Sequence, residues 1–100
     1  MRQELEPVLR FRDAHRVEVA CNEFGVYAGG ADRASQLRWT EDFIAMLQEH
    51  GIGFSYWNYK NLDFGLLSRG ESAFSDYPQY QNPERVDLEL VETLRRCRPL

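Results

Sequence analysis

VEVAC, residues 17–21, and IGFSYW, residues 52–57, are the two runs of sequence that decide the fold. In the first run β-branched residues alternate with other residues, and the second is a short apolar and aromatic run. Each of these patterns predicts a β-strand. Between them, Asp32 to His50 carries apolar residues at helical spacing and is followed directly by Gly51, a typical helix stop. A strand, a helix and a second strand of these lengths predict a crossover unit with parallel strands.

The flanking sequence predicts one helix on each side of this unit. Apolar spacing indicates a helix from about Glu6 to Ala14, with Pro7 in its first turn. A long aromatic and polar loop is expected from Asn58 to about Pro83, followed by a helix over Glu84 to Arg96. We expect that last helix to bury one apolar face and expose one charged face. The apolar face is Val86, Leu90, Val91 and Leu94, and the charged face is Asp87, Glu89, Glu92, Arg95 and Arg96.

Two parallel strands are too few for a complete sheet. Parallel sheets are normally covered on both faces and contain more strands, and both strands predicted here would have an open edge. We therefore expect a piece of a larger α/β sheet, which pairs with the remainder of that sheet or self-associates through its exposed edges.

Composition excludes several classes of protein. The chain is 43% hydrophobic and 28% charged with a net charge of −4, and its basic residues alternate with acids, so we expect neither membrane nor nucleic-acid binding. MRQELEP, residues 1–7, lacks an apolar segment, so no signal peptide is expected in this chain, and localisation stays open. Cys21 and Cys97 lack metal-ligand spacing, so neither a metal nor another cofactor is expected, whereas a disulfide stays open.

The chemistry is expected at the carboxyl ends of the two strands. With a period of two, Glu23 continues the apolar row of the first strand at its end, and Phe24 falls on the opposite side. Trp57 ends the second strand, whereas Phe54 and Tyr56 fall on the side that packs beneath helices. Ligands of parallel α/β folds bind outside the carboxyl ends of strands, and a carboxylate beside an indole suits a sugar. The alternatives are a solvated or ion-paired Glu and a Trp in the core.

VEVACNEFGVY, residues 17–27, followed by a helix and GIGFSYWNYKNLDFGLL, residues 51–67, resembles the C-terminal quarter of glycoside hydrolase family 5. That family comprises retaining (β/α)8-barrel glycosidases such as cellulases. The resemblance implies an α/β fold, a C-terminal fragment of a TIM barrel, with residues 1–100 as part of a catalytic domain. The three predicted helices would be the sixth, seventh and eighth of the barrel, and the two strands would be the seventh and eighth.

The resemblance also implies roles for individual residues. Glu23, in the family's Glu-Phe-Gly sequence, would be the nucleophile, and Trp57 would line the subsite at the cleaved bond. Tyr27, Asn58 and Lys60 are further candidates for substrate contacts. The family's acid/base Glu belongs to an earlier strand that is absent from this chain. The expected function is thus part of a retaining hydrolase of a polysaccharide such as a β-glucan, inactive alone. The alternative is a non-catalytic carbohydrate-binding or self-associating quarter-barrel module.

Overall fold

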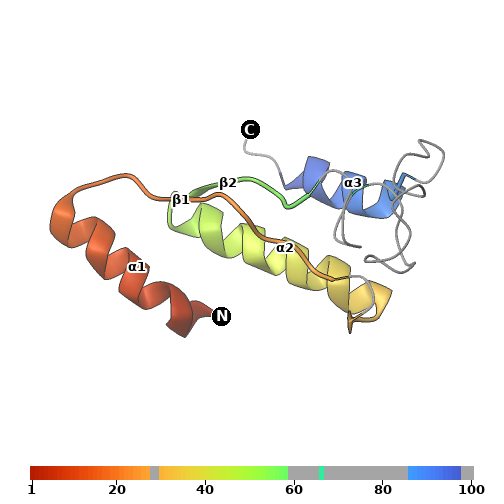
Figure 1. Cartoon of the computed structure of the whole chain (residues 1–100), viewed down its shortest axis with the longest axis horizontal. Helices are drawn as coiled ribbons and strands as arrows, with labels where there is room; N and C mark the ends of the chain where they lie inside the picture. The colour runs from red at the N-terminus through yellow and green to blue at the C-terminus, as the bar shows by residue number, and fades with distance from the viewer. Residues whose placement is uncertain (28–29, 59–65, 67–85, 98–100) are drawn as a thin grey trace, which may run out of the picture.

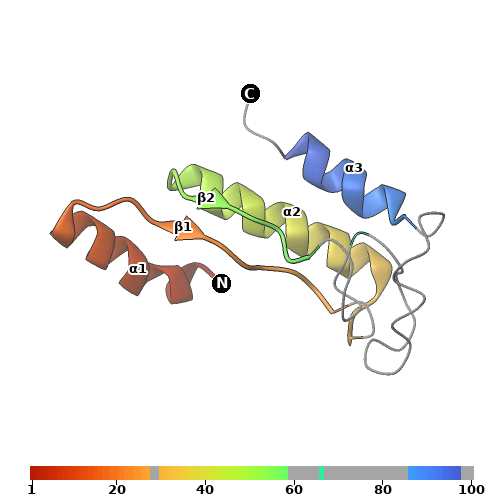
Figure 2. The ribbon, with the colours of Figure 1, turned by 45° about the horizontal axis from the view of Figure 1, so that its top comes forward.

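The computed structural model describes residues 1–27, 30–58, 66 and 86–97. Within these ranges the chain forms three helices and a two-stranded parallel sheet (Figure 1). In chain order the elements are α1 (Arg2–His15), β1 (Ala20–Cys21), α2 (Arg33–Glu49), β2 (Gly53–Phe54) and α3 (Leu88–Arg96). Helices α1 and α3 lie on opposite sides of α2, and the two strands run along α2 (Figures 1 and 2).

Helix α2 agrees with its predicted range to one residue at each end. Asp32 is its N-cap, and the carboxylate accepts hydrogen bonds from Ser35 N at 2.9 Å and Ser35 Oγ at 2.7 Å. The helix stops before Gly51, whose φ of 69° lies in the left-handed region that glycine adopts without steric cost. Ile44 and Leu47 are fully buried, so α2 supplies much of the core.

The strands are parallel, as predicted, but shorter than predicted. Ala20 pairs with Gly53 and Cys21 with Phe54. Val17, inside the predicted first strand, is 43% exposed. A strand is defined by ladder hydrogen bonds, and within the described ranges each strand has only the other as a neighbour. The regular ladder therefore extends over two residues on each side.

Beyond the ladder the register slips by one residue. Ser55 N donates to Cys21 O at 2.9 Å, and Trp57 N donates to Phe24 O at 2.8 Å. In a regular parallel ladder a step of two residues on one strand matches two on the other. Here a step of two on the β2 side spans three on the β1 side, so this segment contains one extra residue, as in a β-bulge.

The extra residue changes the side on which Phe24 lies. Its ring packs against Phe43 of α2 at 5.0 Å, Phe54 at 5.6 Å and Tyr56 at 5.4 Å between centroids, and the residue is 7% exposed. The prediction that Phe54 and Tyr56 pack beneath helices is confirmed. Phe24 is buried and Glu23 is exposed, in agreement with the prediction that they lie on opposite sides. The prediction that strict alternation continues from Cys21 to Phe24 is wrong, because Phe24 packs on the same side as Phe54, the partner of Cys21 in β2.

Helix α1 is longer than predicted and lies at the margin of the fold. It begins at Arg2, and Pro7 lies inside it, because the preceding Gln, Glu and Leu are strong helix formers. None of its residues is buried, and Phe11 is 56% exposed. Polar contacts join it to the end of α2: Arg2 Nη1 lies 2.7 Å from Glu49 Oε2, and Arg12 Nη1 donates to His50 O.

Helix α3 begins later than the predicted start at residue 84. Asp87 is the N-cap, and its Oδ1 accepts from Leu90 N at 3.2 Å, so Val86 lies outside the helix. Leu90 is fully buried, as expected of the apolar face, whereas Val86 is 36% exposed and does not belong to that face. Residues 84 and 85 lie outside the described ranges.

Candidate functional site

Glu23 belongs to the segment after β1 that contains the extra residue. It is exposed, and Cys21 Sγ donates to its backbone carbonyl oxygen at 3.4 Å. Within the described part of the chain its carboxylate forms no ion pair, so of the two alternatives to a catalytic role, a solvated or an ion-paired Glu, the structure agrees with the solvated one. Phe24 is buried next to it. The buried ring fixes the backbone of this segment while the carboxylate before it stays in contact with solvent.

Trp57 lies across the sheet from Glu23. Its backbone N–H donates to the carbonyl oxygen of Phe24 at 2.8 Å, one residue after Glu23, and its side chain is half-buried. Asn58 follows through a cis peptide bond and is also half-buried. The structure thus brings Glu23 and Trp57 to adjacent carboxyl ends of parallel strands, with Asn58 beside them.

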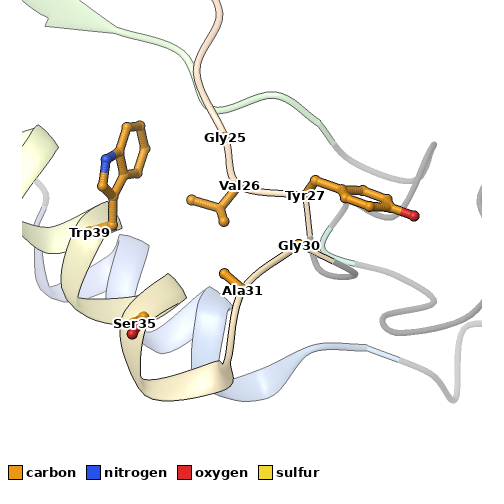
Figure 3. A pocket seen from close by; sticks show the side chains of 7 residues that line it. All are labelled: Gly25, Val26, Tyr27, Gly30, Ala31, Ser35 and Trp39. Carbon is orange, nitrogen blue, oxygen red and sulfur yellow. The ribbon is translucent and has the colours of Figure 1, made fainter.

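The other two predicted contact residues do not join this pair in the described structure. Tyr27 lies farther along the loop, is 39% exposed, and its ring points away from Trp39 across a cavity (Figure 3). Lys60 lies outside the described residues.

The cavity beside Tyr27 was not predicted from the sequence. It has a volume of about 400 Å³ and lies between the loop after β1 and the N-terminal half of α2 (Figure 3). Trp39 contributes an indole that stacks on Phe43 at 4.8 Å and 10°. In the sequence, the helical spacing of Trp39 relative to the other apolar residues of this segment predicted an apolar helix face but no cavity. The lining residues are Gly25, Val26, Tyr27, Gly30, Ala31, Ser35 and Trp39. Because no carboxylate is among them, the cavity offers stacking surface but no acid chemistry.

A partly buried ion pair, also missed by sequence reasoning, joins the start of α2 to the start of α3. Arg33 Nη2 pairs with Asp87 Oδ1, Arg33 Nε lies 3.1 Å from Glu89 Oε2, and Arg33 Nη1 donates to Gln36 Oε1 at 3.0 Å. Asp87 is 8% exposed, so its assignment to the solvated face was wrong. The available signal was its place directly before the apolar run LELV, which is typical of an N-cap.

Tyr56 is in electrostatic reach of this pair. Burial, together with the negative charge of Asp87, raises the pKa of Tyr56 to about 12, although the positive charge of Arg33 opposes the shift. The phenol is therefore neutral over the whole physiological range. Tyr56 directly precedes Trp57 in the chain. The pair of Arg33 and Asp87 therefore acts on the residue next to the one that carries the indole.

The described residues also bear on metal, disulfide and membrane chemistry. They contain no group of three or more His, Cys, Asp or Glu side chains that could hold a metal ion. Cys21 and Cys97 are both free thiols in this structure. None of the described helices has the length and apolar character needed to cross a membrane.

Comparison with known proteins relates part of the chain to a class of enzyme. No protein-family model matches the chain. Endoglucanase C of Acetivibrio thermocellus and Endoglucanase C307 of Clostridium sp. strain F1 are each 39% identical to it over 75 residues, 75% of this chain. The matched stretch is 22% of each relative, so the chain spans about a fifth of their length. The chain is therefore similar to part of two endoglucanases, which are glycoside hydrolases.

Proposed function

We propose that this chain is the C-terminal quarter of a glycoside hydrolase family 5 barrel, in which Glu23 is the nucleophile and Trp57 stacks against the sugar at the cleaved bond. The substrate would be a polysaccharide such as a β-glucan. Two findings support the proposal: the 39% identity to the endoglucanases and the parallel strand–helix–strand unit, which is the repeating unit of such barrels.

The hydrogen bond from Trp57 N to Phe24 O at 2.8 Å is the observation that carries the proposal. It ties the end of β2 to the residue after Glu23. Glu23 is solvent-accessible, and the half-buried indole of Trp57 belongs to the neighbouring strand end. In the proposed mechanism the carboxylate attacks an anomeric carbon while the indole covers the C–H face of the sugar ring.

A retaining glycosidase also needs a second carboxyl group about 5 Å from the first, which protonates the leaving oxygen and then activates water. In the proposed barrel an earlier strand supplies it. We therefore expect the chain alone to lack hydrolytic activity, and we expect its open sheet edges to pair with the strands on either side in the complete barrel.

The test is a chimaera in which this chain replaces the part of Endoglucanase C that it matches, called here the endoglucanase chimaera. We expect it to hydrolyse a soluble β-glucan. We expect Glu23→Gln to lower kcat by at least about a thousandfold, because the amide cannot act as the nucleophile. Glu18→Gln, an exposed Glu upstream of β1, is the matched control and should keep the activity. Normal turnover by Glu23→Gln would refute the assignment.

A non-catalytic carbohydrate-binding or self-associating module is the second candidate. The exposed apolar side chains of α1, with Val8 at 38% and Phe11 at 56%, together with the short unflanked sheet favour self-association. Sedimentation of the chain distinguishes the two. A defined oligomer that binds cello-oligosaccharides, together with an inactive but folded endoglucanase chimaera, would favour this module.

A further inference from the structure

The residue that follows Trp57 is held by a residue later in the chain. Leu66 N donates to Asn58 O at 3.1 Å. Leu66 is half-buried, and it lines a cavity of about 300 Å³ together with residues of β2 and α3 such as Phe54 and Leu94. Leu66 therefore lies between the end of β2 and α3, and its N–H holds the position next to the indole.

The same Leu66 is tied to the start of α3. Asp87 N donates to Leu66 O at 2.6 Å, so the N–H and the carbonyl of Leu66 both form backbone hydrogen bonds. Asp87 is also the N-cap of α3, and its Oδ1 accepts from Leu90 N at 3.2 Å. These bonds form a continuous path from the cap of α3 through Leu66 to Asn58.

Arg33 holds the Asp87 side chain from the neighbouring helix. Arg33 Nη2 pairs with Asp87 Oδ1, the oxygen that caps α3, and the two side chains are 22% and 4% exposed. The guanidinium has two further partners, because Nε lies 3.1 Å from Glu89 Oε2 and Nη1 donates to Gln36 Oε1 at 3.0 Å. Several charge-assisted bonds on one planar group fix its orientation. The place of Asp87, and with it the path to Asn58, therefore depends on α2.

We propose that Arg33 is a positioning residue, which holds the strand end that carries Trp57 in place. It acts through Asp87 and Leu66, the two residues of the path, and does not need to contact the sugar. The proposal deepens the proposed function and rests on it for the role of Trp57. An ion pair that only stabilises the fold would leave Arg33 and Trp57 independent, so the coupling between these two residues separates the two roles.

Amide hydrogen exchange of the 100-residue chain tests the path without any substrate. In Arg33→Ala we expect the Leu66 amide to exchange at least about tenfold faster, because its bond to Asn58 opens more often once Asp87 is released. If Arg33→Ala does not fold, Asp87→Asn takes its place with the same expected result. The Asn side chain keeps an oxygen for the helix cap but lacks the charge that pairs with Arg33.

The control for a general loss of stability is Leu47→Ala. This substitution truncates a fully buried side chain of α2 that is not part of the path, and it lowers stability by creating a cavity. It should accelerate the Leu66 amide less than Arg33→Ala does. Equal or greater acceleration in Leu47→Ala would overturn the inference.

Kinetics of the endoglucanase chimaera test the consequence for Trp57. Arg33→Ala should lower kcat/KM about tenfold when Trp57 is present and less than about twofold in a Trp57→Ala background, because an indole that is absent cannot be misplaced. Arg95→Ala, which breaks the exposed pair with Glu92, should keep the activity. Equal effects of Arg33→Ala in both backgrounds would show that the ion pair only stabilises the fold.

Failure of the positioning role and failure of the proposed function give different results. If Glu23→Gln abolishes turnover while the effects of Arg33→Ala and Trp57→Ala add, the positioning role fails and the proposed function stands. If the chimaera is folded but inactive, the proposed function fails, and the exchange of the Leu66 amide alone decides whether Arg33 holds this strand end.

Discussion

At the scale of single residues, Glu23 and Phe24 show why neighbouring positions have different roles. Glu23 is exposed, whereas Phe24 is 7% exposed and touches three other aromatic rings. The sequence predicted Glu23 at a strand end and Phe54 beneath a helix, because both follow from a period of two. It did not predict the extra residue between Cys21 and Phe24, because the register depends on the pairing of two segments distant in sequence.

Truncation of Phe24 tests its place in the core. Phe24→Ala should lower the free energy of unfolding by about 3–5 kcal/mol, because it removes buried ring contacts and leaves a cavity. Urea denaturation of the chain measures the change. Phe11→Ala, at a position 56% exposed, is the matched control and should change stability by less than about 1 kcal/mol. Equal losses for the two variants would contradict the buried place of Phe24.

The ionisation of Tyr56 predicts a dependence of stability on alkaline pH. Burial raises its pKa from the usual 10.0 to about 12, so the folded state holds the proton more tightly than the unfolded state does. The associated stability is complete below about pH 10 and is lost, by up to about 3 kcal/mol, as the pH rises from 10 to 12. Urea denaturation between pH 8 and 12, compared with Tyr56→Phe, measures the difference. Parallel profiles for the two proteins would contradict the raised pKa.

At the scale of elements, α2 and α3 are joined where they begin. Arg33, the first residue of α2, pairs with Asp87, the N-cap of α3, 54 positions away in sequence. The bounds of α2 were predictable because its Asp cap, helical spacing and terminal Gly are all local signals. The burial of Asp87 was not predictable, because that burial depends on Arg33, which belongs to an element distant in sequence. The early start of α1 was missed because Pro7 looked like a first-turn residue.

Removal of Arg33 tests the link between the helices. Arg33→Ala should destabilise the chain by about 3 kcal/mol, because it removes the Arg33 guanidinium from the buried carboxylate of Asp87. Arg95→Ala breaks the exposed pair with Glu92 on α3 and should cost less than about 1 kcal/mol. Thermal or urea unfolding of both variants provides the comparison. A loss for Arg33→Ala no larger than that for Arg95→Ala would show that the pair does not join the helices.

At the scale of the whole molecule, the described residues form a two-stranded parallel sheet with helices along it. The radius of gyration is 15.1 Å, larger than the value of about 13 Å for a compact domain of 100 residues. The sequence predicted two parallel strands joined by a helix, and that these strands belong to a larger sheet stays a prediction. In the proposed barrel, further strands would pair with the two strand edges, and one of those strands would supply the acid/base residue.

The nucleophile role of Glu23 is the central claim, and a trapped intermediate tests it most directly. The endoglucanase chimaera would be treated with a 2-fluoro cello-oligosaccharide carrying a good leaving group, digested, and analysed by peptide mass spectrometry. A retaining mechanism predicts a covalent glycosyl adduct on the Glu23 carboxylate, and none in Glu23→Gln. An adduct on another residue, or turnover of the parent glycoside without any adduct, would contradict the claim.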